Sequence, residues 1–182
     1  MIWLLVIVIV VLLAAVCMLA YRQRRSAQLR SGFGPEYDRV VEERGDQGKA
    51  EAELRERQQR RRGYDIHPLD PEAQARFAGR WQRTQARFVD QPASALTEAH
   101  ELVDEVMRAR GYPVDDFERQ AGDVSVDHPE LVEHYRKAHA IRADDGASTE
   151  DLRQGLVHYR ALFAELLEPV QEHPTKQTQE VT

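Results

Sequence analysis

The fold is indicated most clearly near the C-terminus, by the stretch STEDLRQGLVHYRALFAEL at residues 148–166. Ser148 to Asp151 has the composition of a helix N-terminus, where a hydroxyl and carboxylates accept hydrogen bonds from unpaired backbone N–H groups. Apolar side chains then recur at steps of four, three, four and three residues: Leu152, Leu156, Tyr159, Phe163 and Leu166. This spacing predicts an amphipathic helix with one face in a core.

Four further helices are predicted between Tyr64 and this segment. Asp70-Pro71 and Pro92 begin two of them, and Asp115 and His128 begin two shorter ones. Their apolar faces consist of Phe77, Trp81 and Phe88; Leu96, Ala99, Val103, Val106 and Met107; Phe117, Ala121 and Val124; and Leu131, Val132, Tyr135, Ala138 and His139. Since no stretch alternates with a period of two, we predict an all-α chain, with a compact bundle of about five short helices over residues 64–168 and a disordered polar tail over 169–182.

Residues 22–63 are predicted to form an Arg-rich helical stalk. Gly34-Pro35-Glu36 has the pattern of a helix start, and Gly45 and Gly48 indicate a break between two helices. The second helix has Leu54 as its one large aliphatic residue, so little burial is expected. Acidic residues alternate with arginines at helical spacing, in the pairs Glu51–Arg55, Glu53–Arg57 and Glu56–Arg60. This alternation favours a solvated spacer over an arginine face for nucleic acid or lipid.

The N-terminus carries an apolar run of 19 residues, Ile2 to Ala20. As a helix it would be about 28 Å long, close to the thickness of the hydrocarbon core of a bilayer. Trp3 and Tyr21 lie at its ends, where aromatic side chains favour the headgroup level. The alternative is a secretory signal peptide, but such a peptide needs basic residues before the run and a good cleavage site after it, and the sequence shows neither. Residues 1–21 are therefore predicted to be a single transmembrane helix.

Arginines follow the apolar run, and none precedes it. Because positive flanks stay on the cytoplasmic side, we predict a single-pass protein with its N-terminus outside and its C-terminal domain in the cytoplasm. The lipid bilayer is the expected partner of residues 2–20. Anionic lipid headgroups are expected to contact Arg22, Arg24, Arg25 and Arg30.

Charge divides along the chain. Residues 21–63 carry 12 lysines and arginines against 8 aspartates and glutamates, whereas residues 64–182 carry 13 against 23. An acidic distal part repels phosphate, so nucleic acid is not an expected partner. Cys17 is the single cysteine, which excludes an intrachain disulfide and a multi-cysteine zinc site.

The chain lacks the sequence motifs of common catalytic sites. The sequence contains none of four such patterns: HExxH, Glu-x-x-His pairs, Gly-rich phosphate loops and Gly-x-Ser-x-Gly. His134 and His139 are five residues apart, which places them about 140° apart around a helix. We therefore predict no catalytic, cofactor-binding or metal-binding residue, and the chain is not expected to be an enzyme.

Several motifs resemble those of a family of small bacterial membrane proteins. They include FGPEYDR at residues 33–39, RGYP at 110–113, and HYR at both 134–136 and 158–160. The resemblance covers nearly the whole chain. It implies one N-terminal transmembrane helix, a helical remainder and a bacterial plasma membrane address, but no activity and no site. The 22 arginines against 3 lysines are typical of a GC-rich genome and agree with a bacterial source.

The leading hypothesis from the sequence is a membrane-tethered adaptor module that presents its acidic domain to a protein partner. The alternative hypothesis is a small ligand-sensing or enzymatic helical domain. That alternative would use a set of His and Tyr residues: His128, His134, Tyr135, His139 and His158. The two hypotheses differ in whether these side chains converge in the folded protein.

Overall fold

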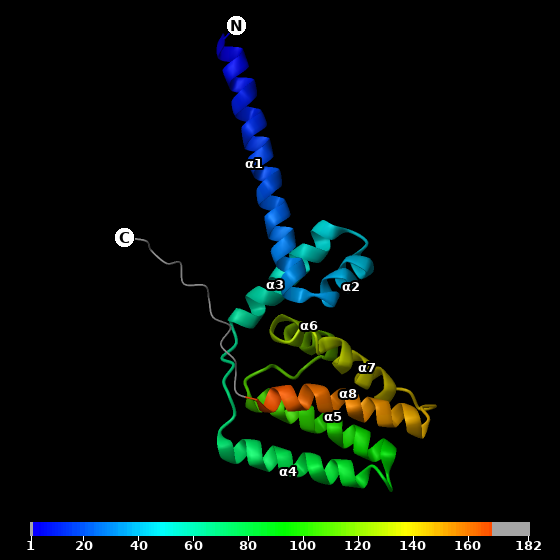
Figure 1. Cartoon of the computed structure of the whole chain (residues 1–182). Coiled ribbons are helices and arrows are strands. Elements are labelled where there is room, and N and C mark those ends of the chain that lie inside the picture. Colours follow the sequence, from blue (N-terminus) through cyan, green and yellow to red (C-terminus); the bar gives the residue numbers. More distant parts are fainter. Residues whose placement is uncertain (1, 169–182) are drawn as a thin grey trace. The chain divides into compact units, whose positions relative to one another are not determined.

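The computed structural model describes residues 2–168, and within them the regular secondary structure is entirely helical (Figure 1). The helices are α1 (Ile2–Phe33), α2 (Pro35–Arg44), α3 (Gln47–Arg62), α4 (Pro71–Arg87), α5 (Pro92–Ala109), α6 (Phe117–Asp127), α7 (Val132–Arg142) and α8 (Thr149–Leu167). The all-α prediction is confirmed. The tail predicted over residues 169–182 lies outside the described residues.

The chain forms two compact units. Of the described residues, unit 1 contains 2–63 together with 121–133, and unit 2 contains 64–120 and 134–168. Residues 121–133 were predicted to belong with the distal helices, yet this segment packs with the N-terminal ones. Two ion pairs, Arg60–Asp123 and Arg61–Asp127, join it to α3.

The first helix does not end where the apolar run ends. α1 continues through the arginines that follow the run, and its last turns pack into unit 1 through Leu29 and Phe33. Among residues 2–168, no helix combines the length and the apolar character needed to cross a membrane. The predicted transmembrane helix over residues 1–21, and with it the description as a single-pass membrane protein, is therefore wrong. The apolar run was predicted to be a separate element, and the predicted orientation depended on that prediction.

Unit 1 has a small hydrophobic core where a solvated stalk was expected. The core residues come from three helices: Leu29, Phe33, Tyr37, Val40, Ala50 and Leu54. Gly34, at φ 51°, permits the sharp turn from α1 into α2, and Gly45, at φ 62°, ends α2 in the left-handed region. The side chain of Asp46 then caps α3 by accepting a hydrogen bond from the Lys49 amide at 2.8 Å. The α2 start and the break before α3 were predicted from these residues.

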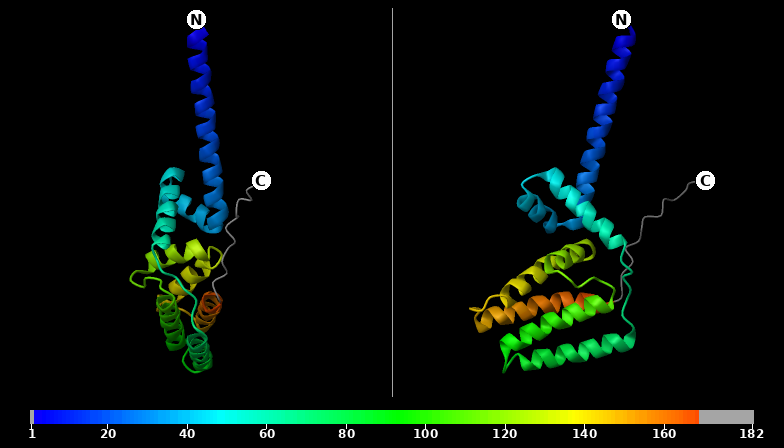
Figure 2. Two further views of the ribbon diagram at one scale, coloured as in Figure 1. Left: turned by 90° about the vertical axis from the view of Figure 1, so that its left-hand side faces the viewer. Right: turned by 180° about the vertical axis from the view of Figure 1, so that it is seen from behind.

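Unit 2 is built around α5, which packs against α4 and α8 (Figure 2). The predicted α8 stripe is buried at Leu156, Tyr159, Phe163 and Leu166. The Phe163 ring stacks on Trp81 of α4, with centroids 4.5 Å apart. α8 begins with a reciprocal capping box between Ser148 and Asp151, as its sequence indicated.

The RGYP segment forms the turn after α5. Gly111 has φ 95°, and a Cβ there would lie 2.2 Å from the Asp65 carbonyl oxygen, so this position requires glycine. Arg110 is buried and donates a hydrogen bond to the Leu166 carbonyl at 2.6 Å. The last carbonyls of a helix have no amide donor within that helix, and Arg110 supplies a donor for one of them at the end of α8.

α7 begins later than predicted. His128-Pro129 was expected to start this helix, but α7 starts at Val132. The His128 amide donates to the Val124 carbonyl at 2.8 Å, and the Leu131 amide donates to the His128 carbonyl at 3.0 Å. These bonds prolong α6 and place a turn where the proline indicated a first helical residue.

Candidate functional site

Four of the five His and Tyr residues of the alternative hypothesis lie in unit 2. His134, Tyr135 and His139 are on α7, and His158 is on α8. His128 lies in unit 1, in the turn after α6. The four residues in unit 2 meet side chains of α5 and α8 and form two adjoining groups.

The first group is a pair of histidines. His134 and His158 approach through their Nδ1 atoms, which are 2.8 Å apart. Both side chains are half-buried. Their ring centroids are 5.0 Å apart, and the rings are inclined by 49°. The geometry is that of a hydrogen bond from one imidazole to the other.

The second group lies between α5, α7 and α8 and contains His100, Asp104, Tyr135, His139 and Tyr159. The His100 ring is 5.9 Å from His139 and 5.7 Å from Tyr159, measured between centroids. Asp104 accepts hydrogen bonds from Gln120 at 3.0 Å and from the Tyr135 hydroxyl at 3.4 Å. We call this group the polar cluster of unit 2.

Burial dominates the electrostatics of the polar cluster. It raises the pKa of the Tyr135 hydroxyl, and the nearby Asp104 carboxylate raises it further. Burial also raises the pKa of Tyr159, although the Arg142 guanidinium opposes the shift. The pKa values of His100 and His139 are lowered by burial and by Arg142. The two phenols and two imidazoles are therefore uncharged at neutral pH.

Some polar atoms of this region have no hydrogen-bond partner in the folded chain. They are the Tyr159 hydroxyl oxygen, His100 Nδ1 and Arg142 Nε. A buried polar atom without a partner costs about 1–3 kcal/mol unless water or a ligand supplies one.

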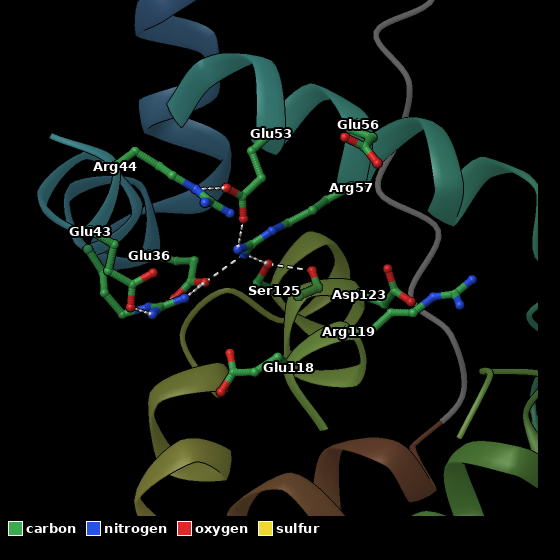
Figure 3. A network of polar contacts seen from close by, with 12 residues as sticks. Glu36, Glu43, Arg44, Glu53, Glu56, Arg57, Glu118, Arg119, Asp123 and Ser125 are labelled. Atoms are coloured by element: carbon green, nitrogen blue, oxygen red, sulfur yellow. Dashed lines mark hydrogen bonds and ion pairs between the residues drawn. The ribbon is translucent and has the colours of Figure 1, made fainter. Parts of the chain in front are cut away.

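A second polar network lies in unit 1 around Arg57. Its guanidinium bonds Glu36 at 2.7 Å and Glu53 at 2.5 Å, and Ser125 lies 3.4 Å away (Figure 3). The Arg57 side chain is 7% exposed and that of Glu36 is 2% exposed. Gly122 leaves room for Arg57, since a Cβ there would approach the guanidinium to 3.3 Å. Through these contacts Arg57 links α2, α3 and α6.

The charges of unit 1 neutralise one another. Burial raises the pKa of the Glu53 carboxyl, but hydrogen bonds from Arg44 and Arg57 outweigh it and lower the pKa below its ordinary value. Of the predicted i,i+4 pairs, Glu53–Arg57 and Glu56–Arg60 form. The Arg55 Nε donates instead to the Glu51 carbonyl at 2.8 Å. The role of this network is to hold helices together.

The groups that the sequence analysis missed are His100, Asp104, Arg142 and Tyr159. The spacing of His100 and Asp104, four residues apart on one helix face, was a signal for the first two. Arg142 and Tyr159 carried no such signal, because they come to the cluster from two different helices, α7 and α8. In the described residues, no group of three or more His, Cys, Asp or Glu side chains is arranged to hold a metal ion. Cys17 is exposed on α1.

The resemblance of the FGPEYDR, RGYP and HYR motifs to a small bacterial family stays a prediction from the sequence. Neither protein-family models nor curated proteins nor solved structures give a match to this chain.

Proposed function

We propose that this protein is a helical interaction module, in which unit 2 presents an acidic surface to a basic segment of a protein partner. The observation that carries the proposal is the distribution of charge between the units. The described part of unit 1 contains 12 basic and 12 acidic residues, whereas that of unit 2 contains 12 basic and 17 acidic residues. The excess negative charge therefore belongs to unit 2.

Many acidic side chains of unit 2 lie on its surface. The loop between α7 and α8 and the start of α8 expose Asp144, Asp145, Glu150 and Asp151. Exposed carboxylates attract a basic partner over about a Debye length, and they raise the rate of association more than the final affinity. A partner that uses this surface should bind more weakly as the salt concentration rises.

Site-specific crosslinking in cells tests the proposal. A photo-crosslinking residue is placed at Glu101 on α5 and at Asp145 in the loop, both exposed. We expect the same partner from both positions. Capture from Glu101 should be at least about tenfold weaker when Asp144→Lys and Asp145→Lys reverse the charge of the loop. Gln82→Lys, at an exposed position on α4, is the matched control and should leave capture unchanged. Capture that ignores charge reversal, or no shared partner, would contradict the proposal.

A contact between α1 and lipid is a second proposal, and it rests on the exposed surface of this helix. Large apolar side chains are exposed along its N-terminal part, including Val10 at 59%, Leu13 at 60% and Met18 at 65%. Extended apolar surfaces of this kind mark contacts with proteins or lipids. Arg22, Arg24 and Arg25 follow them and are exposed, which favours anionic headgroups. Binding to a lipid surface does not require the helix to cross it.

Vesicle flotation tests the lipid contact. Neutral phosphatidylcholine vesicles are compared with vesicles that contain phosphatidylserine. Replacement of Arg22, Arg24 and Arg25 by Gln should weaken binding to the anionic vesicles about 100-fold, at ~1 kcal/mol for each arginine. Arg30→Gln should have a smaller effect, because Arg30 already pairs with Asp38 at 2.9 Å. Equal binding of wild type and triple variant to anionic vesicles would refute the role of these arginines.

A further inference from the structure

Two copies of the tripeptide His-Tyr-Arg meet in unit 2. One copy is on α7 (residues 134–136) and the other on α8 (158–160). Their tyrosines, Tyr135 and Tyr159, are 0% exposed, with ring centroids 6.3 Å apart. Each histidine directly precedes one of these buried tyrosines. The tyrosines therefore hold the backbone of the two histidines in place, and the His134 and His158 rings meet at a half-buried position.

The contact between the two rings constrains their protonation. A hydrogen bond between two Nδ1 atoms, here 2.8 Å apart, needs one ring that donates and one that accepts. At least one imidazole is therefore neutral, with an in-plane lone pair on Nδ1. When both rings are neutral and carry their proton on Nε2, both lone pairs point into the same space. Two lone pairs repel each other, but a cation between them is bound by both.

We propose that His134 and His158 form a two-histidine binding site for a divalent transition-metal ion such as Zn²⁺ or Ni²⁺. Imidazole nitrogen is a preferred ligand of these ions, with Zn–N distances of about 2.0–2.1 Å. At angles of about 90–110° at the metal, two such nitrogens lie about 2.9–3.4 Å apart. The two Nδ1 atoms therefore need to separate by about 0.1–0.6 Å from the observed 2.8 Å, and the rings need to turn by about 35–45° so that both lone pairs meet at the ion.

The site has an open coordination sphere. No third His, Cys, Asp or Glu is arranged to join it in the described residues, so water completes the shell. An ion held by two protein ligands exchanges more readily than one in a closed four-ligand site. The proton shared between the Nδ1 atoms moves to Nε2 or to solvent as the metal binds. Acid therefore competes with the metal. This proposal is independent of the partner-binding function proposed above.

Equilibrium dialysis of the full chain, without a polyhistidine tag, against ZnCl₂ and NiCl₂ tests the site. At pH 7.5 we expect one ion for each chain. His134→Gln and His158→Gln each remove one ligand with little change in volume, and each should weaken binding at least about tenfold. His67, an exposed histidine in the segment before α4, provides the matched control, because His67→Gln should leave binding unchanged.

Independent readouts separate loss of a ligand from loss of the fold. Circular dichroism should show the same helix content for all variants. The metal should slow hydrogen exchange in α7 and α8 of the wild type and of His67→Gln, but not of His134→Gln or His158→Gln. Weaker wild-type binding at pH 5.5 than at pH 7.5 is also expected. The proposal is overturned if neither ion binds the wild type, if both variants bind as the wild type does, or if His67→Gln weakens binding as much as they do.

Discussion

Arg57→Ala should destabilise unit 1 more than any removal of a surface charge. The substitution deletes a guanidinium that bonds Glu36 at 2.7 Å and Glu53 at 2.5 Å. Glu36, with its side chain 2% exposed, loses this contact and keeps its ion pair with Arg39, at 2.7 Å. The buried Glu36 carboxylate thereby loses a counter-charge.

The size of the effect follows from burial. Removal of one partner of a buried ion pair typically costs about 3–5 kcal/mol, because the other charge stays buried. An exposed pair contributes about 0–1 kcal/mol. Arg30–Asp38 is such a pair in the same unit, with side chains 65% and 63% exposed. Arg30→Ala therefore matches Arg57→Ala in chemistry and differs from it in burial.

Hydrogen exchange followed by mass spectrometry reports on unit 1 by itself. A loss of 3 kcal/mol speeds exchange through unfolding by about 100-fold or more. We expect this acceleration in α2, α3 and residues 121–127 of Arg57→Ala, and less than about tenfold in Arg30→Ala. The double variant Arg57→Met with Glu36→Gln should recover part of the loss, since no net charge is then left unpaired at this position. An acceleration below tenfold in Arg57→Ala, or one equal to that of Arg30→Ala, would refute the reasoning.

Three further predictions concern unit 2. The stability of unit 2 should fall as the pH drops below about 6.5, because the pKa values of His100 and His139 are lowered in the folded state and the unfolded chain binds protons first. Denaturant unfolding across pH 5–8 measures this fall, and His139→Gln should make the free energy of unfolding depend less steeply on pH. Gly111→Ala should lower the free energy of unfolding by more than about 2 kcal/mol in thermal unfolding, because Gly111 has a φ of 95° and an added Cβ would clash with the Asp65 carbonyl. Gly32→Ala should be neutral or stabilising, because a Cβ there would meet open space. Tyr135→Phe should cost about 1 kcal/mol, because it removes the hydrogen bond from the Tyr135 hydroxyl to Asp104. Tyr159→Phe should change the stability by less than about 1 kcal/mol, and a larger loss would show that the Tyr159 hydroxyl has a partner.

Local signals predicted the helices well. Pro71, Pro92 and Ser148 lie at or next to the first residue of α4, α5 and α8, as expected from their residue types. Their effect is local, because caps and prolines act through backbone groups within one turn. His128-Pro129 failed as a signal for the same reason. The hydrogen bonds that prolong α6 past Asp127 compete with it, and a local pattern does not reveal which set forms.

Such local patterns did not predict the ion pairs between residues that are distant in the sequence. The arginines of α3 were expected to pair along their own helix, and some do, but Arg60 and Arg61 also reach Asp123 and Asp127. These partners lie more than 60 residues away in the chain. Side-chain spacing along a helix contains no information about which distant segment supplies a counter-charge.

The apolar run shows the same limit. Its composition determines that residues 2–20 form a helix, yet it predicted a separate spanning element. In the structure these residues belong to a longer helix whose last turns pack with α2 and α3. Where that helix ends depends on Gly34 and on the burial of Phe33.

Residue type and periodicity were sufficient to determine the helical class, most helix starts, the core face of α8 and the acidic character of the distal part. The division into units and both polar groups of unit 2 were decided only by tertiary packing. His134 and His158 are 24 residues apart, and each is unremarkable on its own helix. Their rings meet because burial of Tyr135 and Tyr159 orients α7 and α8, and this constraint acts on both helices only once the chain has folded.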